Sequence, residues 1–362
     1  MKILVLTNSL SGLISFRKEV IKSFIDKGHS VYIAAPESNR SEELKDIGAR
    51  VLITPVDRRG TNPFHDFSLL LSYIKLLRLI RPDVVLTYTI KPNVYGGLAC
   101  RLTGIPQIAN ITGLGTSLEN VGLLQKISRS LYKFGLLKAK TVFFQNTGNL
   151  NYCISSGIVK PKQVKLLPGS GVNLQQFHVF DYPEDSVIRF LYIGRLMQAK
   201  GTDELLWVAK QIKQEHFNIE FHIVGSYEDN YQKIFKEYIN EGIVVFHGSK
   251  DDVRPYIRNC SCLIHPSHHE GMSNVILEAC ACGRPVITTD ICGCREAVDD
   301  GITGFLALPR DSNDLLLKVK RFAGLSLNDR KNMGIAARSK VEKSFDRNIV
   351  IKAYNDEIST IK

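Results

Sequence analysis

Residues 262–288 have the sequence CLIHPSHHEGMSNVILEACACGRPVIT. The stretch opens with a short apolar segment at Cys262–His265 and closes with another at 285–288, both with the length and composition of buried strands. A helix is expected between them, beginning near Ser273 or Asn274, because Ser and Asn are favoured at helix N-caps. A strand, a helix and a second strand in this order are typical of a parallel sheet covered by helices, so the stretch predicts an α/β fold.

The same alternation of strands and helices extends outward from this stretch. In the second half of the chain, further strands are expected at 189–193, 219–224, 244–247 and 304–306. In the first half, strands are expected at 3–7, 30–35, 51–54, 84–88, 107–110 and 141–145, with helical periodicity at 16–27, 39–47, 67–80, 94–102 and 123–137. Both halves therefore predict a doubly wound parallel sheet.

Two domains are expected, because 362 residues are too many for one ordinary domain. The alternation breaks at 167–185, which is rich in Gly, Pro, Asn and Gln. The sequence thus predicts an N-terminal Rossmann-like domain at 1–167 and a C-terminal one at 168–344. The final segment, 345–362, is expected to be helical and either closes the second domain or crosses back to the first.

The formal net charge of +11 lies entirely in the first half of the chain. Residues 1–180 contain 23 Lys and Arg against 10 Asp and Glu, whereas residues 181–362 contain 24 against 26. Residues 120–165 contain eight basic residues and no acidic one. A surface of this charge is expected to attract phosphates, whether of a nucleic acid, a membrane surface or an anionic lipid.

No segment has the roughly 18–20 continuous apolar residues that a membrane span requires, and the first apolar run is too short for a signal peptide. The protein is therefore expected to be cytoplasmic. The eight cysteines include three Cys-x-Cys pairs, at 260/262, 280/282 and 292/294. This spacing differs from that of Cys-x-x-Cys zinc sites, and the pairs lie in segments expected to be core or turn, so no metal is predicted.

The loops after the strands should carry the chemistry, because ligands of open parallel sheets bind at the carboxyl ends of the strands. After the strand at 189–193 comes GRLMQAKG, which places Arg195 and Lys200 on one loop. Two cations at one strand end suit the two phosphates of a diphosphate, since Arg offers a fork of donors and Lys a mobile charge. An ordinary exposed charged loop is the alternative.

The loop after Cys262–His265 leads into the predicted helix, with Glu270 just before it and Glu278 one turn inside it. The start of this helix offers backbone amides to an anion, and the helix dipole strengthens the site. The amides in question are those of Gly271, Met272, Ser273, Asn274 and Val275. Carboxylates on both sides of an anion site suit a nucleotide sugar, whose hydroxyls flank its diphosphate.

Together with GSGVN at 169–173, TYTIKPNVYGG at 87–97 and NITGLGTSLEN at 110–120, these motifs resemble the retaining glycosyltransferases of family 4. The resemblance extends over nearly the whole chain. It is strongest to the bacterial branch that builds capsule, O-antigen and glycan precursors on polyprenyl diphosphates, in which N-acetylgalactosaminyl and galactosyl transferases are common. It implies the GT-B fold, with two Rossmann-like domains facing across a cleft.

Position by position, the resemblance implies a role for each residue of the donor site. Glu278 would hold the ribose hydroxyls, and Glu270 would face the transferred sugar near its 3-hydroxyl. Arg195 and Lys200 would neutralise the leaving diphosphate. The implied catalytic residues are therefore Glu270, Arg195 and Lys200.

Two glycines complete the implied donor site. Gly12, in the loop after the first strand, would let the N-terminal domain approach the donor phosphates. Gly248 lies in the segment 247–253, which would border the base.

The acceptor side departs from the family pattern. Many relatives carry a histidine near the sugar in a short run that aligns with residues 111–113, and here that position is Thr112. A threonine hydroxyl would have to replace whatever the histidine does. The acceptor-side assignments are Lys91, Asn93 and Thr112.

The expected activity is thus metal-independent, retaining transfer of an N-acetylhexosamine or galactose from a UDP-sugar to a polyprenyl-diphosphate-linked saccharide. No cofactor is expected, since Arg195, Lys200 and the helix amides supply positive potential. A nucleotide-sugar epimerase of the same two-domain fold is the alternative, and it would need no acceptor. A basic nucleic-acid-binding protein is a remote alternative, because the recognition modules of that class are not apparent.

The helix at 123–137 has two distinct faces. Its basic face carries Lys126, Arg129 and Lys133, and its apolar face carries Leu124, Ile127, Leu131 and Phe134. The apolar face is expected to be core. The basic face is expected to dock the protein peripherally on the anionic inner surface of the cell membrane, where a lipid-linked acceptor would lie.

Overall fold

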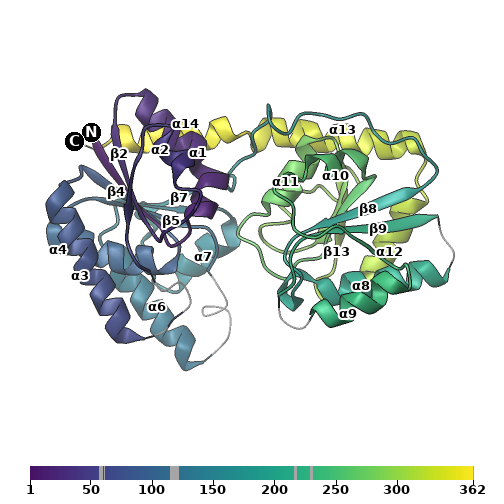
Figure 1. Ribbon diagram of the computed structural model, residues 1–362, viewed down its shortest axis with the longest axis horizontal. Helices are drawn as coiled ribbons and strands as arrows, with labels where there is room; N and C mark the ends of the chain where they lie inside the picture. Colours follow the sequence, from purple (N-terminus) through teal and green to yellow (C-terminus); the bar gives the residue numbers. More distant parts are fainter. Residues whose placement is uncertain (57–59, 61, 115–121, 216–217, 229–230, 362) are drawn as a thin grey trace. The chain divides into compact units, whose positions relative to one another are not determined.

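The computed structural model describes residues 1–56, 60, 62–114, 122–215, 218–228 and 231–361. These divide into two compact units (Figure 1). The first unit is Met1–Ser170 together with Asn348–Lys362, and the second is Gly171–Arg347. The last helix therefore belongs to the first unit.

The first unit is built on a seven-stranded sheet of order β3-β2-β1-β4-β5-β6-β7, whose described strand pairs are all parallel. Its strands are β1 Lys2–Leu6, β2 Ser30–Ala35, β3 Arg50–Ile53, β4 Val84–Tyr88, β5 Gln107–Ile111, β6 Thr141–Phe144 and β7 Val164–Leu166. Its longer helices are α1 Leu10–Asp26, α3 Pro63–Ile80, α4 Gly97–Thr103, α6 Leu123–Leu136, α7 Thr147–Ser155 and α14 Arg347–Ser359. Shorter turns are α2 Glu42–Lys45, the π-helical η1 Pro92–Gly96 and η2 Pro161–Gln163.

Helices cover both faces of this sheet. Apolar residues of α1 and α14 share one core with the strands, whereas α3 and α4 pack on the other face and α6 and α7 continue that layer. Polar contacts fix α14 to the sheet. The Tyr354 hydroxyl donates to Asn110 Oδ1, and the Thr141 hydroxyl donates to Glu357 at 2.5 Å.

The second unit has a six-stranded parallel sheet of order β10-β9-β8-β11-β12-β13. Its strands are β8 Ile188–Ile193, β9 Ile219–Val224, β10 Val245–Phe246, β11 Cys262–His265, β12 Val286–Thr289 and β13 Gly304–Ala307. Its helices are η3 Gln198–Lys200, α8 Thr202–Gln214, α9 Tyr231–Asn240, α10 Arg254–Asn259, α11 Asn274–Ala281, α12 Ser312–Ala323 and α13 Leu327–Ser344. The prediction of two doubly wound parallel sheets is confirmed.

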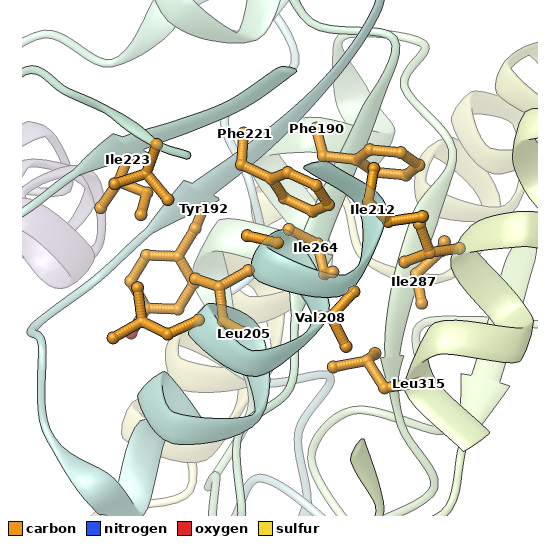
Figure 2. Packing of buried hydrophobic residues seen from close by; sticks show 14 of the residues in the cluster. Phe190, Tyr192, Leu205, Val208, Ile212, Phe221, Ile223, Ile264, Ile287 and Leu315 are labelled. Atoms are coloured by element: carbon orange, nitrogen blue, oxygen red, sulfur yellow. The ribbon is translucent and has the colours of Figure 1, made fainter. Parts of the chain in front are cut away.

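Aromatic and β-branched side chains fill the core beneath α8 (Figure 2). Phe190 of β8 stacks on Phe221 of β9 with ring centroids 5.4 Å apart. Leu205, Val208 and Ile212 lie at helical spacing on α8 and cover these strands. This core packs against β8, and the loop that follows β8 carries Arg195 and Lys200.

Each sheet has one point where the strand order reverses direction. In the first sheet it lies between β1 and β4, and in the second between β8 and β11. Ligands of doubly wound sheets bind at the carboxyl ends of the strands at such a point. In the second unit, this geometry brings together the loop after β8 and the loop after β11.

Candidate active site

Lys200 and Glu270 meet at the switch point of the second sheet. The Lys200 ammonium donates a hydrogen bond to Glu270 Oε1 at 2.5 Å. The next residue, Gly201, has a φ of 69° and passes so close to Pro266 that a Cβ on it would lie 1.9 Å from the Pro266 carbonyl oxygen. Only glycine fits there, so the final glycine of GRLMQAKG is what lets the two loops pack together.

Glu270 accepts a second hydrogen bond on the same oxygen. His265, the last residue of β11, lies with Nε2 2.9 Å from Glu270 Oε1. Burial acts to raise the pKa of Glu270, but the hydrogen bond and charge of His265, together with those of Lys200, lower it to about 2. Glu270 is therefore a carboxylate at neutral pH, and it can accept hydrogen bonds from the hydroxyl groups of a ligand.

Arg195 lies exposed on the loop after β8, as predicted, and forms an ion pair. Its guanidinium is 2.7 Å from Glu228 Oε1. No local pattern in the sequence indicates this acidic neighbour. Because a guanidinium has five N–H donors, the pair with Glu228 leaves others for a phosphate.

Helix α11 begins where the sequence predicts, with Ser273 at the N-cap position. The Ser273 hydroxyl does not cap the helix, because its Oγ lies 3.1 Å from His265 Nε2 instead. The Ser273 amide donates to the Gly293 carbonyl at 2.9 Å, which corrects the prediction that this amide is available to an anion. The amides of Asn274 and Val275 occupy the first turn, where the helix itself supplies no acceptor.

The remaining groups at the helix start differ in their surroundings. The Met272 side chain is buried in the core that α11 forms with β11 and β12, so only its backbone can serve a ligand. Gly271 precedes it directly. Among the described residues, the Asn274 side-chain oxygen is buried without a hydrogen-bond partner. Such an acceptor is costly unless a ligand or water satisfies it.

Glu278 lies within α11 and is largely buried. Its burial raises its pKa to about 7, against the opposing charge of Arg347. An ordinary surface glutamate of a helix would keep a pKa near 4.3. The environment of Glu278 therefore differs from that of a solvent-facing helix residue and suits a carboxyl that receives a polar ligand.

Gly248 follows β10 and has a φ of 72°, and a Cβ there would meet no atom within 4 Å. Its carbonyl accepts a hydrogen bond from the Gly225 amide at 3.0 Å. The neighbouring His247 lies with Nε2 2.9 Å from His222 Nδ1 and packs its ring against Tyr256. Flat rings thus border the open backbone at Gly248.

In the first unit, Gly12 lies in the first turn of α1. Its amide donates to the hydroxyl of the N-cap residue Ser9 at 3.2 Å, and a Cβ on Gly12 would lie 3.1 Å from that oxygen. Glycine therefore allows a tight cap. This leaves the loop after β1 compact at the switch point of the first sheet.

The three residues assigned to the acceptor side, Lys91, Asn93 and Thr112, have different surroundings. Asn93 is buried, with Oδ1 accepting from the Thr87 hydroxyl at 2.7 Å and Nδ2 donating to the Asn110 carbonyl at 2.9 Å. Both ends of its side chain join β4, η1 and β5, and the assignment of Asn93 to the acceptor side stays a prediction. Lys91 is paired with Asp66 at 2.6 Å, whereas Thr112 is exposed just beyond β5.

The expectation that the apolar face of α6 is core is wrong. Ile127, Leu131 and Phe134 are 48%, 36% and 55% exposed, and the side chain of Leu124 lies outside the described residues. The helix instead buries Tyr132 and Leu136, together with Gly135, on which a Cβ would lie 2.6 Å from the Val94 Cα atom. Close packing through glycine decides which face turns inward.

The basic face of α6 lies where the sequence predicts. Lys126 and Lys133 are exposed, and Arg129 is half-buried and donates to the Ser156 carbonyl at 3.1 Å. None of the helices in the described part of the chain combines the length and apolar character needed to cross a membrane.

Buried thiols account for most of the Cys-x-Cys pairs. All of their cysteines except the partly exposed Cys292 are buried. Burial raises the pKa of the Cys260, Cys280 and Cys282 thiols to about 12. Within the residues the structure describes, no group of three or more His, Cys, Asp and Glu side chains could hold a metal ion.

His265 is the residue of this site that sequence reasoning missed. It contacts both Glu270 and Ser273 although it belongs to a strand that is otherwise apolar. A polar residue at the carboxyl end of a buried strand, at a switch point, was the available signal.

Two family models match the chain. The model described as "Glycosyl transferase 4-like" matches residues 2–146, and the model described as "Glycosyl transferases group 1" matches residues 188–324. The two matches fall in the two structural units.

Individual proteins resemble the chain over nearly its full length. The N,N'-diacetylbacillosaminyl-diphospho-undecaprenol alpha-1,3-N-acetylgalactosaminyltransferase of Campylobacter jejuni is 26% identical, covering 98% of this chain and 97% of its own. The UDP-Gal:alpha-D-GlcNAc-diphosphoundecaprenol alpha-1,3-galactosyltransferase of Escherichia coli is 23% identical, covering 96% and 90%. The crystal structure of Anabaena HepE with UDP and glucose superposes with a TM-score of 0.82 at 18% identity, covering 99% and 100%.

Proposed function

The chain belongs to the glycosyltransferases of family 4 with the GT-B fold, and on this premise we propose that it moves a sugar from a UDP-sugar to a polyprenyl-diphosphate-linked saccharide. The sugar is an N-acetylhexosamine or galactose, and the reaction serves surface polysaccharide or glycan synthesis. The observation that carries the proposal is the Lys200–Glu270 pair beside the uncapped start of α11. The epimerase alternative has no support, since the matched models and relatives are glycosyltransferases.

The donor diphosphate binds at the switch point of the second sheet. Arg195 and Lys200 provide two cations, and the first amides of α11 provide directed donors with the helix dipole behind them. These groups act most strongly on the charge that builds up as the sugar–phosphate bond breaks. Because these groups provide the positive charge, the reaction needs no metal ion.

The two glutamates grip opposite ends of the donor. Glu270 accepts hydrogen bonds from hydroxyls of the transferred sugar, and these bonds strengthen as the sugar becomes cationic in the transition state. Glu278 accepts from the two ribose hydroxyls, and Gly248 borders the base.

Transfer retains the anomeric configuration. The acceptor hydroxyl attacks carbon 1 from the face that the leaving UDP vacates, the carbon–oxygen bond to UDP breaks, and the departing phosphate oxygen takes the acceptor proton. The enzyme contributes position and charge stabilisation rather than a covalent nucleophile.

The acceptor is presented at an anionic membrane surface, on which the enzyme docks peripherally from the cytoplasmic side. The outer layer of the first unit supports this, because α3, α4 and α6 lie side by side and contain six Lys and Arg against a single acidic residue. That residue, Asp66, is paired with Lys91. The layer therefore presents an almost purely basic surface, which suits anionic lipid headgroups.

Exposed apolar side chains accompany the basic ones on this layer. Besides Ile127, Leu131 and Phe134 of α6, they include Phe64 and Phe67 in the first turns of α3, which are 83% and 60% exposed. Both helices follow strands, so their N-terminal ends lie at the carboxyl edge of the sheet. Apolar side chains surrounded by basic ones suit insertion among lipid headgroups. Nucleic acid would not use this apolar surface, and we expect that the protein does not bind nucleic acid.

A panel of UDP-sugars tests the donor assignment. Slow release of UDP from one or two of them by the purified enzyme, in the absence of acceptor, is the expected result. Conversion of a UDP-sugar to its epimer without UDP release would contradict the proposal.

A further inference from the structure

We propose that His265 is a positioning residue that prepares both halves of the donor site. It holds Glu270 toward the sugar, and it turns the Ser273 hydroxyl away from the start of α11, which leaves the helix amides uncapped for the diphosphate. This inference rests on the proposed function.

The contacts of His265 require its Nε2 to carry a proton. This nitrogen lies 2.9 Å from the carboxylate oxygen of Glu270 and 3.1 Å from Ser273 Oγ. A nitrogen lone pair would repel a carboxylate, so the N–H donates to Glu270. The Ser273 oxygen lies close enough to share the same hydrogen.

The imidazole ring is held firmly in this orientation. His265 is 3% exposed, its ring stacks against that of Tyr192, and its carbonyl accepts from the Thr288 hydroxyl at 2.7 Å. Its other ring nitrogen, Nδ1, is buried without a hydrogen-bond partner among the described residues. The structure thus tolerates an unsatisfied nitrogen in order to aim Nε2 at the donor site.

Ser273 has the backbone of an N-cap residue but does not act as one. Its φ of −76° and ψ of 105° are extended, as in the N-cap residues of capped helices. Elsewhere in the described chain, Ser9 of α1 and Ser326 of α13 accept hydrogen bonds from the first turn of their own helices. The difference at α11 is the contact with His265, because it draws the serine hydroxyl to the side.

Loss of the histidine contact should therefore have two separable effects. Glu270 would keep Lys200 but lose its second donor, so its carboxylate would be less well oriented toward the sugar. The Ser273 hydroxyl would be free to accept from the amides of the first turn and so compete with the donor phosphates.

Three variants separate these effects. His265→Asn shortens the side chain so that it reaches neither partner, and His265→Gln keeps a donor near the position of Nε2. In His265→Asn with Ser273→Ala, the competing hydroxyl is also absent. Ser326→Ala is the matched control, because it removes a serine that does cap its helix, far along the chain from the site.

UDP affinity by calorimetry, kcat and KM for the UDP-sugar, and melting temperature are measured for each protein. We expect His265→Asn to bind UDP about fivefold more weakly, as the gain of an N-cap would cause, and to lose kcat as well. Adding Ser273→Ala should restore UDP affinity but not kcat. The UDP affinity of His265→Gln should stay within about twofold of that of the natural protein. Ser326→Ala should lower only the melting temperature.

Unchanged UDP affinity in His265→Asn would overturn the inference, as would failure of Ser273→Ala to restore it. If His265→Asn does not fold, His265→Gln decides alone. A loss of UDP affinity well beyond twofold in His265→Gln would overturn the inference, because it would mean that the ring itself is required and not the donor at the position of Nε2. Failure of the proposed function is distinguishable, because it would appear as absence of sugar transfer to any acceptor by the natural protein, whatever the UDP affinities of the variants.

Discussion

Lys200 Nζ and Glu270 Oε1 lie 2.5 Å apart although 70 residues separate them in the chain. The pair joins a cation suited to phosphate with a carboxylate suited to sugar hydroxyls, at the ends of the adjacent strands β8 and β11. A donor whose sugar and diphosphate are neighbours would contact both residues at once.

The two glutamates should have separable kinetic effects. Glu270→Gln is expected to lower kcat by about a hundredfold or more, the size of effect seen when a transition-state contact is removed. Glu278→Gln is expected mainly to raise KM for the UDP-sugar. Steady-state kinetics over a range of donor concentrations measure both, and near-normal activity in both variants would defeat the assignment.

UDP binding should depend on pH through Glu278. Its pKa of about 7 without ligand should fall when ribose hydroxyls donate to the carboxylate, so that binding releases a proton. Affinity is then expected to rise with pH, approaching tenfold per pH unit below pH 6, and to level off above pH 7.5. Calorimetric titration with UDP across this range measures the slope. In Glu278→Gln only the slope caused by the terminal phosphate of UDP itself should remain, and an unchanged slope in that variant would assign the proton elsewhere.

Activity should survive excess EDTA. We propose that Arg195, Lys200 and the amides of α11 supply positive charge to the diphosphate, so the reaction is expected to need no divalent cation. UDP release with and without chelator is the measurement. A loss of activity that manganese or magnesium restores would mean that the phosphate site has been assigned wrongly.

Membrane docking should require both the basic and the exposed apolar side chains of the layer formed by α3, α4 and α6. Changing Lys126, Arg129 and Lys133 to Gln is expected to weaken binding to anionic vesicles by about a hundredfold, at about 1 kcal/mol per basic residue. The double change Phe64→Ser with Phe67→Ser should weaken the vesicle binding that remains at high salt, where charge is screened. Cosedimentation at several salt concentrations measures both.

Leu317→Ser is the matched control for the vesicle experiment. Leu317 is 63% exposed on α12 of the second unit, outside the basic layer, so its loss should leave binding unchanged. Equal binding of the natural protein to neutral vesicles would contradict the electrostatic part of the account.

The architecture and the positions of several residues of the proposed donor site could be predicted from local patterns. Alternating strands and helices identify both sheets, and α11 begins where Ser273 and Asn274 predict. The loop positions of Arg195 and Glu270 follow from the rule that chemistry lies at the carboxyl ends of strands. Each of these features depends on residues close together in the sequence.

The remaining features depend on contacts that periodicity does not encode. Amphipathicity shows that α6 has an apolar face but does not say whether it turns inward, and the close approach of Gly135 to Val94 decides this. The burial of Asn93 depends on Thr87 and Asn110, which belong to two different strands. The role of His265 could not be predicted from the sequence, because its partners Glu270 and Ser273 come close to it only when the loop after β11 folds back on the strand.

Transfer of labelled sugar to a lipid-linked acceptor tests the central claim most directly. The enzyme is incubated with UDP-sugar and a polyprenyl-diphosphate-linked saccharide in anionic vesicles, and the lipid fraction and released UDP are followed together. The account predicts acceptor-dependent, equimolar appearance of UDP and of labelled lipid-linked product, with the anomeric configuration of the donor retained in its nuclear magnetic resonance spectrum. Inverted configuration, or UDP-sugar conversion without any labelled lipid across a panel of donors and acceptors, would contradict it.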